Sequence, residues 1–221
     1  TQQWALDVPM MDKLDFFHLD QMPARKRKRW MHHYRECVKR QLLLNGGAGA
    51  HLSKNPMMSG WVEALLQTFP DARIAVVMRD PAQCIPSVLK LMQFSWRGRG
   101  WKHVDYAASM RELIQISFDT FRHPRTVLAA HPETPQAVVD YRQLTTQPRE
   151  TVLALYKALG MRVSSDFDAY LQQQEQKERG HRTPFAYSIE EFAEDGLSRA
   201  RIETELADFY AEFDWPGGEQ V

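Results

Sequence analysis

The sequence has few of the features that mark secreted, membrane-bound or nucleic-acid-binding proteins. Only two of its 221 residues are cysteines, Cys37 and Cys84, which argues against a disulfide framework and favours a reducing compartment such as the cytoplasm. No apolar run approaches the ~20 residues of a transmembrane helix, and no signal-peptide pattern is visible. Because 28 basic residues balance 28 acidic ones, no overall field attracts nucleic acid or a membrane surface. We therefore expect partners to be recognised locally.

The composition is that of a folded domain. Hydrophobic residues make up 43% and aromatic residues 11% of the chain, enough for a full core. Neither internal repeats nor a low-complexity linker interrupts it. We therefore expect one domain over residues 1–221, with residues 1–22 peripheral or joined to sequence further upstream.

Apolar periodicity predicts alternating strands and helices. Short β-branched or apolar runs predict strands at residues 51–54, 72–78 and 136–141, the second of them buried on both faces. A period of about 3.6 residues predicts helices over 23–44, 104–121 and 148–159, and a final helix that begins at Ser198. Ser188 and Glu191 have the spacing of a capping box. The alternation predicts an α/β fold, a parallel sheet flanked by helices.

Two cations stand where strands end and helices begin. Arg79 follows the second strand, and Asp80-Pro81 then has the pattern of an N-cap and first helical residue. Lys54 occupies the same place before Asn55 and the next helix. Parallel sheets bind ligands at this edge, and helix amino termini favour phosphate. The pattern indicates an anion site, although two solvated charges at loop entrances would have the same spacing.

The order of these segments resembles the sulfotransferases that use 3'-phosphoadenosine 5'-phosphosulfate (PAPS). The stretches "LSKNP", "LLQTFPDAR" and "VVMRDP", with a serine eight residues after the arginine, are similar to the branch that reads "LKxP", "LLexFPDA" and "RDPxxxxxS". "VVDYRQL" and the terminal "RGH" and "YSIEEF" also resemble segments of that family. The resemblance covers roughly residues 29–213. It implies a P-loop-NTPase-like core and transfer of a sulfuryl group from PAPS to a hydroxyl or amine acceptor.

The resemblance also implies roles for individual residues. Lys54 matches the lysine that neutralises the leaving oxygen, while Arg79 and Ser87 match residues that hold the 3'-phosphate. Tyr141 matches a tyrosine near the adenine. A second phosphate clamp is implied near the end of the chain, with the candidates Arg179, His181 and Arg182, although their spacing departs from the family pattern. Family acceptors include sugars, lipids, phenols and peptides, so we expect a small-molecule or glycan acceptor. We expect no metal ion in the site.

Two family features are missing. The glycine-rich "TGxPRSGTT" loop, whose backbone N–H groups cradle the 5'-phosphosulfate, does not occur; Gly46 and the glycines after it follow a helix instead. Either the chain is a fragment, which its start at Thr1 without an initiator Met favours, or it has lost half of the donor site. A processed or tag-cleaved start explains Thr1 equally well. Met58 stands where several members carry a histidine that serves as general base. His51, His103 or a residue upstream would have to replace it.

Other patterns carry less weight. Residues 25–29 are all basic, but they open an amphipathic helix in a neutral chain, so we interpret them as a solvated face rather than a nucleic-acid site. His32 and His33 point about 100° apart on a helix and lack ligand partners, which argues against a metal. Residues 96–101, "WRGRGW", predict a flexible loop that either covers the acceptor or is merely exposed.

Two other functions remain open from the sequence. One is a non-catalytic relative whose crevice binds a nucleotide or a protein. The other is a kinase-like P-loop enzyme, which the lack of a Walker lysine and of an acidic metal-binding pattern argues against.

Overall fold

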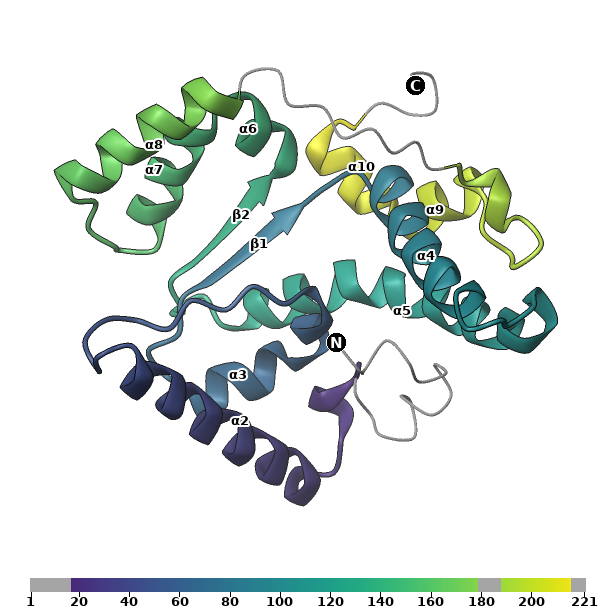
Figure 1. Ribbon diagram of the computed structural model, residues 1–221, viewed down its shortest axis with the longest axis horizontal. Coiled ribbons are helices and arrows are strands. Elements are labelled where there is room, and N and C mark those ends of the chain that lie inside the picture. The colour runs from purple at the N-terminus through teal and green to yellow at the C-terminus, as the bar shows by residue number, and fades with distance from the viewer. Residues whose placement is uncertain (1–16, 179–187, 216–221) are drawn as a thin grey trace. The chain divides into compact units, whose positions relative to one another are not determined.

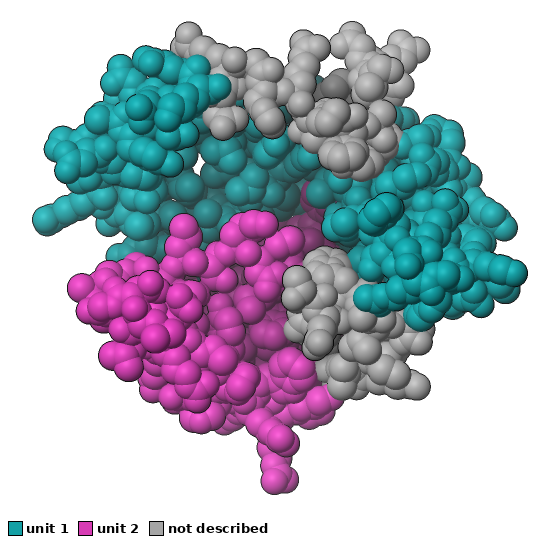
Figure 2. Space-filling model, viewed as in Figure 1, with its two compact units in different colours: residues 1–7, 73–118, 135–221 teal, residues 8–72, 119–134 magenta. Residues whose placement is uncertain are grey.

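The computed structural model describes residues 17–178 and 188–215, and these form two compact units. Within the described residues, unit 1 comprises residues 73–118, 135–178 and 188–215, and unit 2 comprises residues 17–72 and 119–134 (Figure 2). Strands alternate with helices in unit 1, whereas the described part of unit 2 contains helices and loops but no strand.

Unit 1 is built on two parallel strands, β1 (Ile74–Met78) and β2 (Gln136–Asp140) (Figure 1). The register pairs Met78 with Asp140, so both strands end at the same edge. The helices of this unit are listed here in chain order: α4 (Pro81–Arg97), the first part of α5 (His103–Ala130), α6 (Tyr141–Thr146), α7 (Pro148–Ala158), α8 (Ser165–Glu178), η4 (Glu190–Phe192), α9 (Arg199–Glu205) and α10 (Ala207–Phe213).

Unit 2 packs short helices against one long helix. Its elements are η2 (Leu19–Gln21), α2 (Ala24–Leu44), η3 (Pro56–Trp61), α3 (Val62–Thr68) and the end of α5. One core cluster contains Leu19, Met22, Met31, Trp61 and Ala64. Gly60 is required in η3, because a Cβ there would lie 1.8 Å from the carbonyl oxygen of Phe17.

Most of the expected helices are present, and their ends have the expected caps. α2 ends at Leu44 with Asn45 as its C-cap, and Gly46 follows with a φ of 86°, a conformation that glycine adopts without strain. α7 is followed by Gly160, whose φ is 63°. α5 is longer than predicted: it continues past residue 121 to Ala130, where buried Leu128 extends its apolar face.

The strand predictions need two corrections. Residues 51–54 do not form a strand; they are exposed, and the sheet of the described residues contains only β1 and β2. β1 is not buried on both faces, since Val77 is 50% exposed and Val138 of β2 is 45% exposed. The apolar run predicted a strand inside a wide sheet, but two strands alone leave part of each face uncovered.

Two predictions near the end of the chain are also wrong in detail. Ser188 accepts from the backbone N–H of Glu190 at 3.2 Å, not from Glu191, because a single 3₁₀ turn follows rather than an α-helix. The helix that Ser198 caps stops at Glu205, and α10 begins after a break at Leu206. The apolar stripe nevertheless crosses the break, because Ile202, Leu206 and Phe209 are all buried.

Candidate functional site

The carboxyl edge of the two-stranded sheet is shaped by two aspartate caps. Asp80 follows β1, and its side chain accepts a hydrogen bond from the N–H of Ala82 at 2.9 Å. Asp140 ends β2 and accepts from the N–H of Arg142 at 2.8 Å. Each aspartate thus starts a helix as its strand ends, which confirms the predicted cap at Asp80 and adds a second one.

Arg79 and Tyr141 meet at this edge. The Arg79 guanidinium carbon lies 5.1 Å from the centroid of the Tyr141 ring, a cation–π contact. Tyr141 is the first residue of α6 rather than the end of the strand. Arg79 Nη2 donates to Gln83 Oε1 at 3.3 Å, while Arg79 Nε is buried and has no hydrogen-bond partner among the described residues. A buried donor on a cation suits an anionic ligand.

Ser87 lies further along α4, on the face that begins at Gln83. Side chains four residues apart are neighbours on a helix surface, so Ser87 is one turn from the partner of Arg79, and it is half-buried. Burial raises the pKa of the Cys84 thiol between them, and the nearby Arg79 charge offsets only part of that rise. This cysteine therefore remains a neutral thiol.

Helix α10 also contacts this edge, which the sequence did not reveal. The Tyr210 hydroxyl donates to Asp80 Oδ1 at 3.0 Å. Burial, followed by the neighbouring Asp80 charge, raises the pKa of Tyr210 far above its ordinary value, so the phenol is a donor. Only the apolar periodicity of Tyr210 was visible in the sequence, and that pattern predicts burial without predicting a polar partner.

Lys54 lies in unit 2, on the exposed segment before η3. The structure shows no ion pair of Lys54 with any other described residue. Its neighbours are held on both sides: the Tyr34 hydroxyl donates to Ser53 Oγ at 3.4 Å, and Asn55 Oδ1 accepts from the N–H of Met57 at 3.1 Å. The N-cap predicted at Asn55 is confirmed, and Lys54 projects a charge beside the helix start.

A pocket of about 480 Å³ lies in unit 2 just before Lys54. It is lined by Gln41, Leu42, Asn45, Ala48, Ala50, His51 and Leu52. Leu52 is 93% exposed, and the neighbouring Leu43 and Leu44 are 77% and 81% exposed. His51, one of the candidate bases, is therefore part of the pocket wall.

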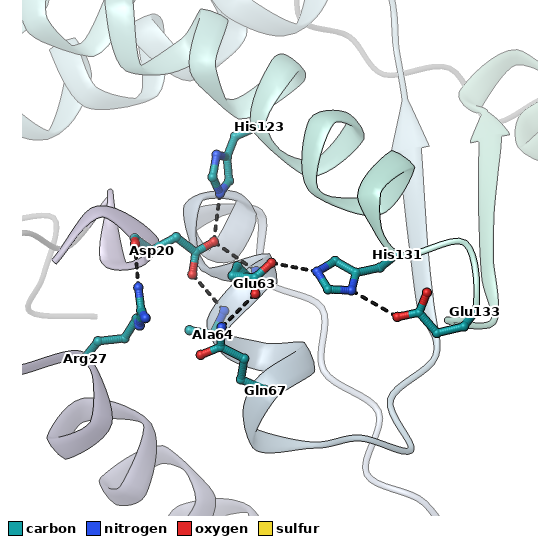
Figure 3. A network of polar contacts seen from close by, with 8 residues as sticks. All are labelled: Asp20, Arg27, Glu63, Ala64, Gln67, His123, His131 and Glu133. Atoms are coloured by element: carbon teal, nitrogen blue, oxygen red, sulfur yellow. Dashed lines mark hydrogen bonds and ion pairs between the residues drawn. The ribbon is translucent and has the colours of Figure 1, made fainter. Parts of the chain in front are cut away.

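A polar network holds α3, the helix that follows η3 (Figure 3). Asp20 accepts from the N–H groups of Glu63 at 2.9 Å and Ala64 at 2.8 Å, at the amino end of α3. His123 Nε2 lies 2.7 Å from Asp20 Oδ2, and His131 Nε2 lies 2.8 Å from Glu63 Oε2. These long-range partners could not be read from local sequence.

His103, another candidate base, lies at the end of α4 opposite Arg79. It contacts Asp195 at 2.9 Å and packs edge-on against Tyr106. The 17 residues of α4 span about 25 Å, which separates His103 from the sheet edge. Trp96, expected in a flexible loop, is instead fully buried within α4 and stacked on Tyr106 at 5.1 Å. The tryptophan packs in the core and forms no lid.

The remaining predictions concern residues elsewhere in the chain. Arg179, His181 and Arg182 lie outside the described residues. His32 and His33 are exposed on α2, and no group of three or more potential metal ligands occurs in the part of the chain that the structure describes. In the same part, no helix is long and apolar enough to cross a membrane.

Comparison with known proteins identifies the family. Residues 3–165 match the profile of the Sulfotransferase family. The chain belongs to the sulfotransferase family. It is 26% identical over 118 residues to omega-hydroxy-beta-dihydromenaquinone-9 sulfotransferase Stf3 of Mycobacterium bovis and of Mycobacterium tuberculosis. These matches cover 53% of this chain and 30% of each relative.

The fold comparison agrees with the family. Sulfotransferase STF9 from Mycobacterium avium superimposes with a TM-score of 0.61 at 19% identity, covering 77% of this chain and 44% of that one. The chain thus spans less than half of the relatives it matches. The likeness to STF9 confirms the predicted α/β sulfotransferase fold, and the individual site residues stay predictions.

Proposed function

We propose that this protein takes part in sulfuryl transfer from PAPS, with the carboxyl edge of unit 1 binding the adenosine 3'-phosphate end of the donor. The observation that carries the proposal is Arg79, which lies against the Tyr141 ring with a buried Nε that has no described partner. A phosphate supplies acceptor oxygens for such a donor. Ser87 would add a hydroxyl, and Tyr141 offers an aromatic surface to the adenine.

The proposed reaction is an in-line displacement. The bond between sulfur and the bridging phosphate oxygen breaks while a bond from sulfur to the acceptor oxygen forms, and the acceptor proton passes to a base. Lys54 would neutralise the charge that grows on the bridging oxygen. Its exposed ammonium group, beside a capped helix start, is available for that role. His51 is the candidate base that shares unit 2 with Lys54.

We further propose a hydroxylated acceptor with an apolar body. The name of the Stf3 relatives specifies an omega-hydroxy acceptor. In this chain, the pocket that His51 lines combines polar side chains with Leu42 and Leu52, and the exposed Leu43 and Leu44 are next to it in the sequence. Such a surface suits a ligand whose apolar part needs cover and whose hydroxyl needs a polar neighbour.

Nucleotide binding tests the proposal without requiring turnover. Calorimetry should detect binding of 3'-phosphoadenosine 5'-phosphate, and Arg79→Ala should weaken it by roughly 2–4 kcal/mol, the scale of losing a charged pair in a partly desolvated site. Arg73→Ala is the matched control, because Arg73 precedes the same strand and donates to the carbonyl of Leu159 at 2.9 Å. Unchanged affinity in Arg79→Ala would remove Arg79 from the site. If the protein bound the nucleotide but transferred no sulfuryl group to any acceptor tested, the alternative of a non-catalytic relative would be favoured instead.

A further inference from the structure

Helix α10 is tied to the end of β1 through one hydroxyl. Tyr210 donates to the same Asp80 oxygen that caps α4, and Asp80 is only 9% exposed. A phenylalanine at position 210 would fill nearly the same space. The hydroxyl therefore adds a directed link to the cap, beyond the burial of the ring.

The end of α10 is tied to β2 through Arg142. Its Nε and Nη2 donate to Asp140 Oδ2 at 2.9 and 2.6 Å. Its Nη1 donates to the carbonyl of Asp214 at 3.2 Å, and Nη2 also donates to the carbonyl of Phe213. Carbonyls at a helix end lack partners within the helix, so Arg142 satisfies them while it holds the strand cap.

Charge favours this second link. Burial alone would raise the pKa of Asp140, but the hydrogen bonds and charge of Arg142 outweigh it and hold that pKa below its ordinary value. Asp140 is therefore ionised at neutral pH, and the two-pronged contact with Arg142 is a charge-assisted pair with defined geometry.

The two links join the same strand ends that carry the candidate nucleotide residues. Arg79 directly precedes Asp80, Tyr141 directly follows Asp140, and the Arg79 and Tyr141 side chains are in contact. Beneath the links, α10 is anchored by buried Phe209 and by Trp215, which stacks on Phe213 at 4.7 Å. These contacts connect the end of β1 to α10 and α10 to the end of β2, and the Arg79–Tyr141 contact joins the two strand ends directly.

We propose that α10 is a clasp in which Tyr210 and Arg142 are positioning residues, fixing the spacing of Arg79 and Tyr141 and thereby the selection of a nucleotide with a 3'-phosphate. The proposal rests on the proposed function, because it concerns the same binding edge. Neither residue needs to touch the nucleotide. Each acts through the aspartate next to the residue that does.

The test compares two nucleotides that differ in one group. Affinities of residues 1–221 for 3'-phosphoadenosine 5'-phosphate and for adenosine 5'-phosphate give a ratio that reports 3'-phosphate recognition. Tyr210→Phe should lower this ratio about tenfold, the scale of one hydrogen bond, with little change in thermal unfolding. Arg142→Lys, which keeps the charge but loses the fork, should also lower it. Tyr170→Phe is the control, since Tyr170 is 53% exposed on α8.

A double variant separates positioning from general stability. If Tyr210 acts through Arg79, Tyr210→Phe should have almost no further effect on the ratio once Arg79 is alanine. Additive effects, or equal losses of affinity for both nucleotides, would overturn the clasp. If the wild type prefers the nucleotide with a 3'-phosphate and Tyr210→Phe leaves the affinity ratio unchanged, the clasp is overturned while the proposed function stands. A wild type that binds neither nucleotide would overturn the proposed function together with the clasp.

Discussion

Helix α4 of unit 1 and helix α3 of unit 2 are capped in different ways. In unit 1, Asp80 caps α4 by accepting a hydrogen bond from the backbone N–H of Ala82, only two residues further along the chain. In unit 2, the first N–H groups of α3 are bound by Asp20, which lies 43 and 44 residues away in sequence. A local cap forms wherever the chain makes the turn, whereas a distant cap exists only when the tertiary fold is complete. The start of α4, next to Arg79, is therefore set largely by its own segment, whereas the start of α3 depends on packing.

The candidate residues Arg79 and Lys54 also differ in how firmly their side chains are held. Arg79 is restrained by Gln83 and Tyr141, which suits a residue that binds the ground state. Lys54 is exposed and its segment contains no regular strand. A lysine so placed can move with the charge that develops during transfer, which suits a role in the transition state.

The largest expected effect comes from Lys54→Ala. If Lys54 stabilises the leaving oxygen, kcat should fall about 10²–10³-fold, the usual scale for one electrostatic donor, while nucleotide affinity changes much less. The measurement is steady-state kinetics on an active form of the protein, set beside calorimetry. Lys39→Ala is the control, because Lys39 pairs with Glu36 on α2. Normal turnover in Lys54→Ala would exclude it from the mechanism.

The second effect concerns the distant cap. Asp20→Ser should lower the free energy of unfolding by about 2–4 kcal/mol, because one short hydroxyl cannot replace two carboxylate oxygens that bind two N–H groups and His123. Chemical denaturation followed by circular dichroism measures it. Asp71→Ser is the control, since Asp71 is exposed in the same unit. A loss no greater than that of the control would mean that Asp20 does not hold α3.

The same substitution at the local cap should cost less. Serine is about as good an N-cap as aspartate, so Asp80→Ser keeps the start of α4 and loses mainly the bond from Tyr210. We expect a loss of about 0.5–1 kcal/mol, the net value of one hydrogen bond. Comparing Asp20→Ser with Asp80→Ser under identical conditions is the direct test of the contrast between the units. Equal losses would show that the origin of a cap does not matter here.

The same contrast explains what could be predicted from the sequence. Features encoded within a few residues were predictable: the Asp80 and Asn55 caps, the glycine after α2, and the parallel strands at 74–78 and 136–140. The placement of Arg79 beside Tyr141 follows from the parallel register of those strands. The predicted strand at 51–54 failed because a single apolar residue, Leu52, does not specify a pairing partner.

What escaped prediction depends on partners that are far apart in sequence. The links from Tyr210 to Asp80 and from Arg142 to the end of α10 span 130 and up to 72 residues. Tyr210 fits an apolar stripe equally well with or without a hydrogen bond from its hydroxyl. Arg142 belongs to no apolar pattern that would have indicated a buried partner. Trp96 was misplaced because glycines and arginines beside it suggested a loop, whereas its ring completes the core under α4.

The smallest expected effect is a pH dependence within unit 2. His131 lies between Glu133 at 3.0 Å and Glu63 at 2.8 Å, and its hydrogen bonds to these two carboxylates raise its pKa above the ordinary value. Because the folded state binds this proton more tightly than the unfolded state, the stabilisation is fully present below the unfolded pKa of about 6.5. It is lost as the pH rises through the higher pKa of the folded protein.

His131→Gln should therefore lower the melting temperature more at pH 5.5 than at pH 8.5. Gln keeps a hydrogen-bonding group of similar size but cannot carry the positive charge that the two glutamates attract. His51→Gln is the control, since His51 is an exposed histidine of the same unit and lines the pocket. Because the ring is partly exposed and the pair is screened by solvent, the shift should be small and should shrink further in high salt. An equal loss at both pH values would show that His131 holds α3 and the end of α5 by packing rather than by its charge.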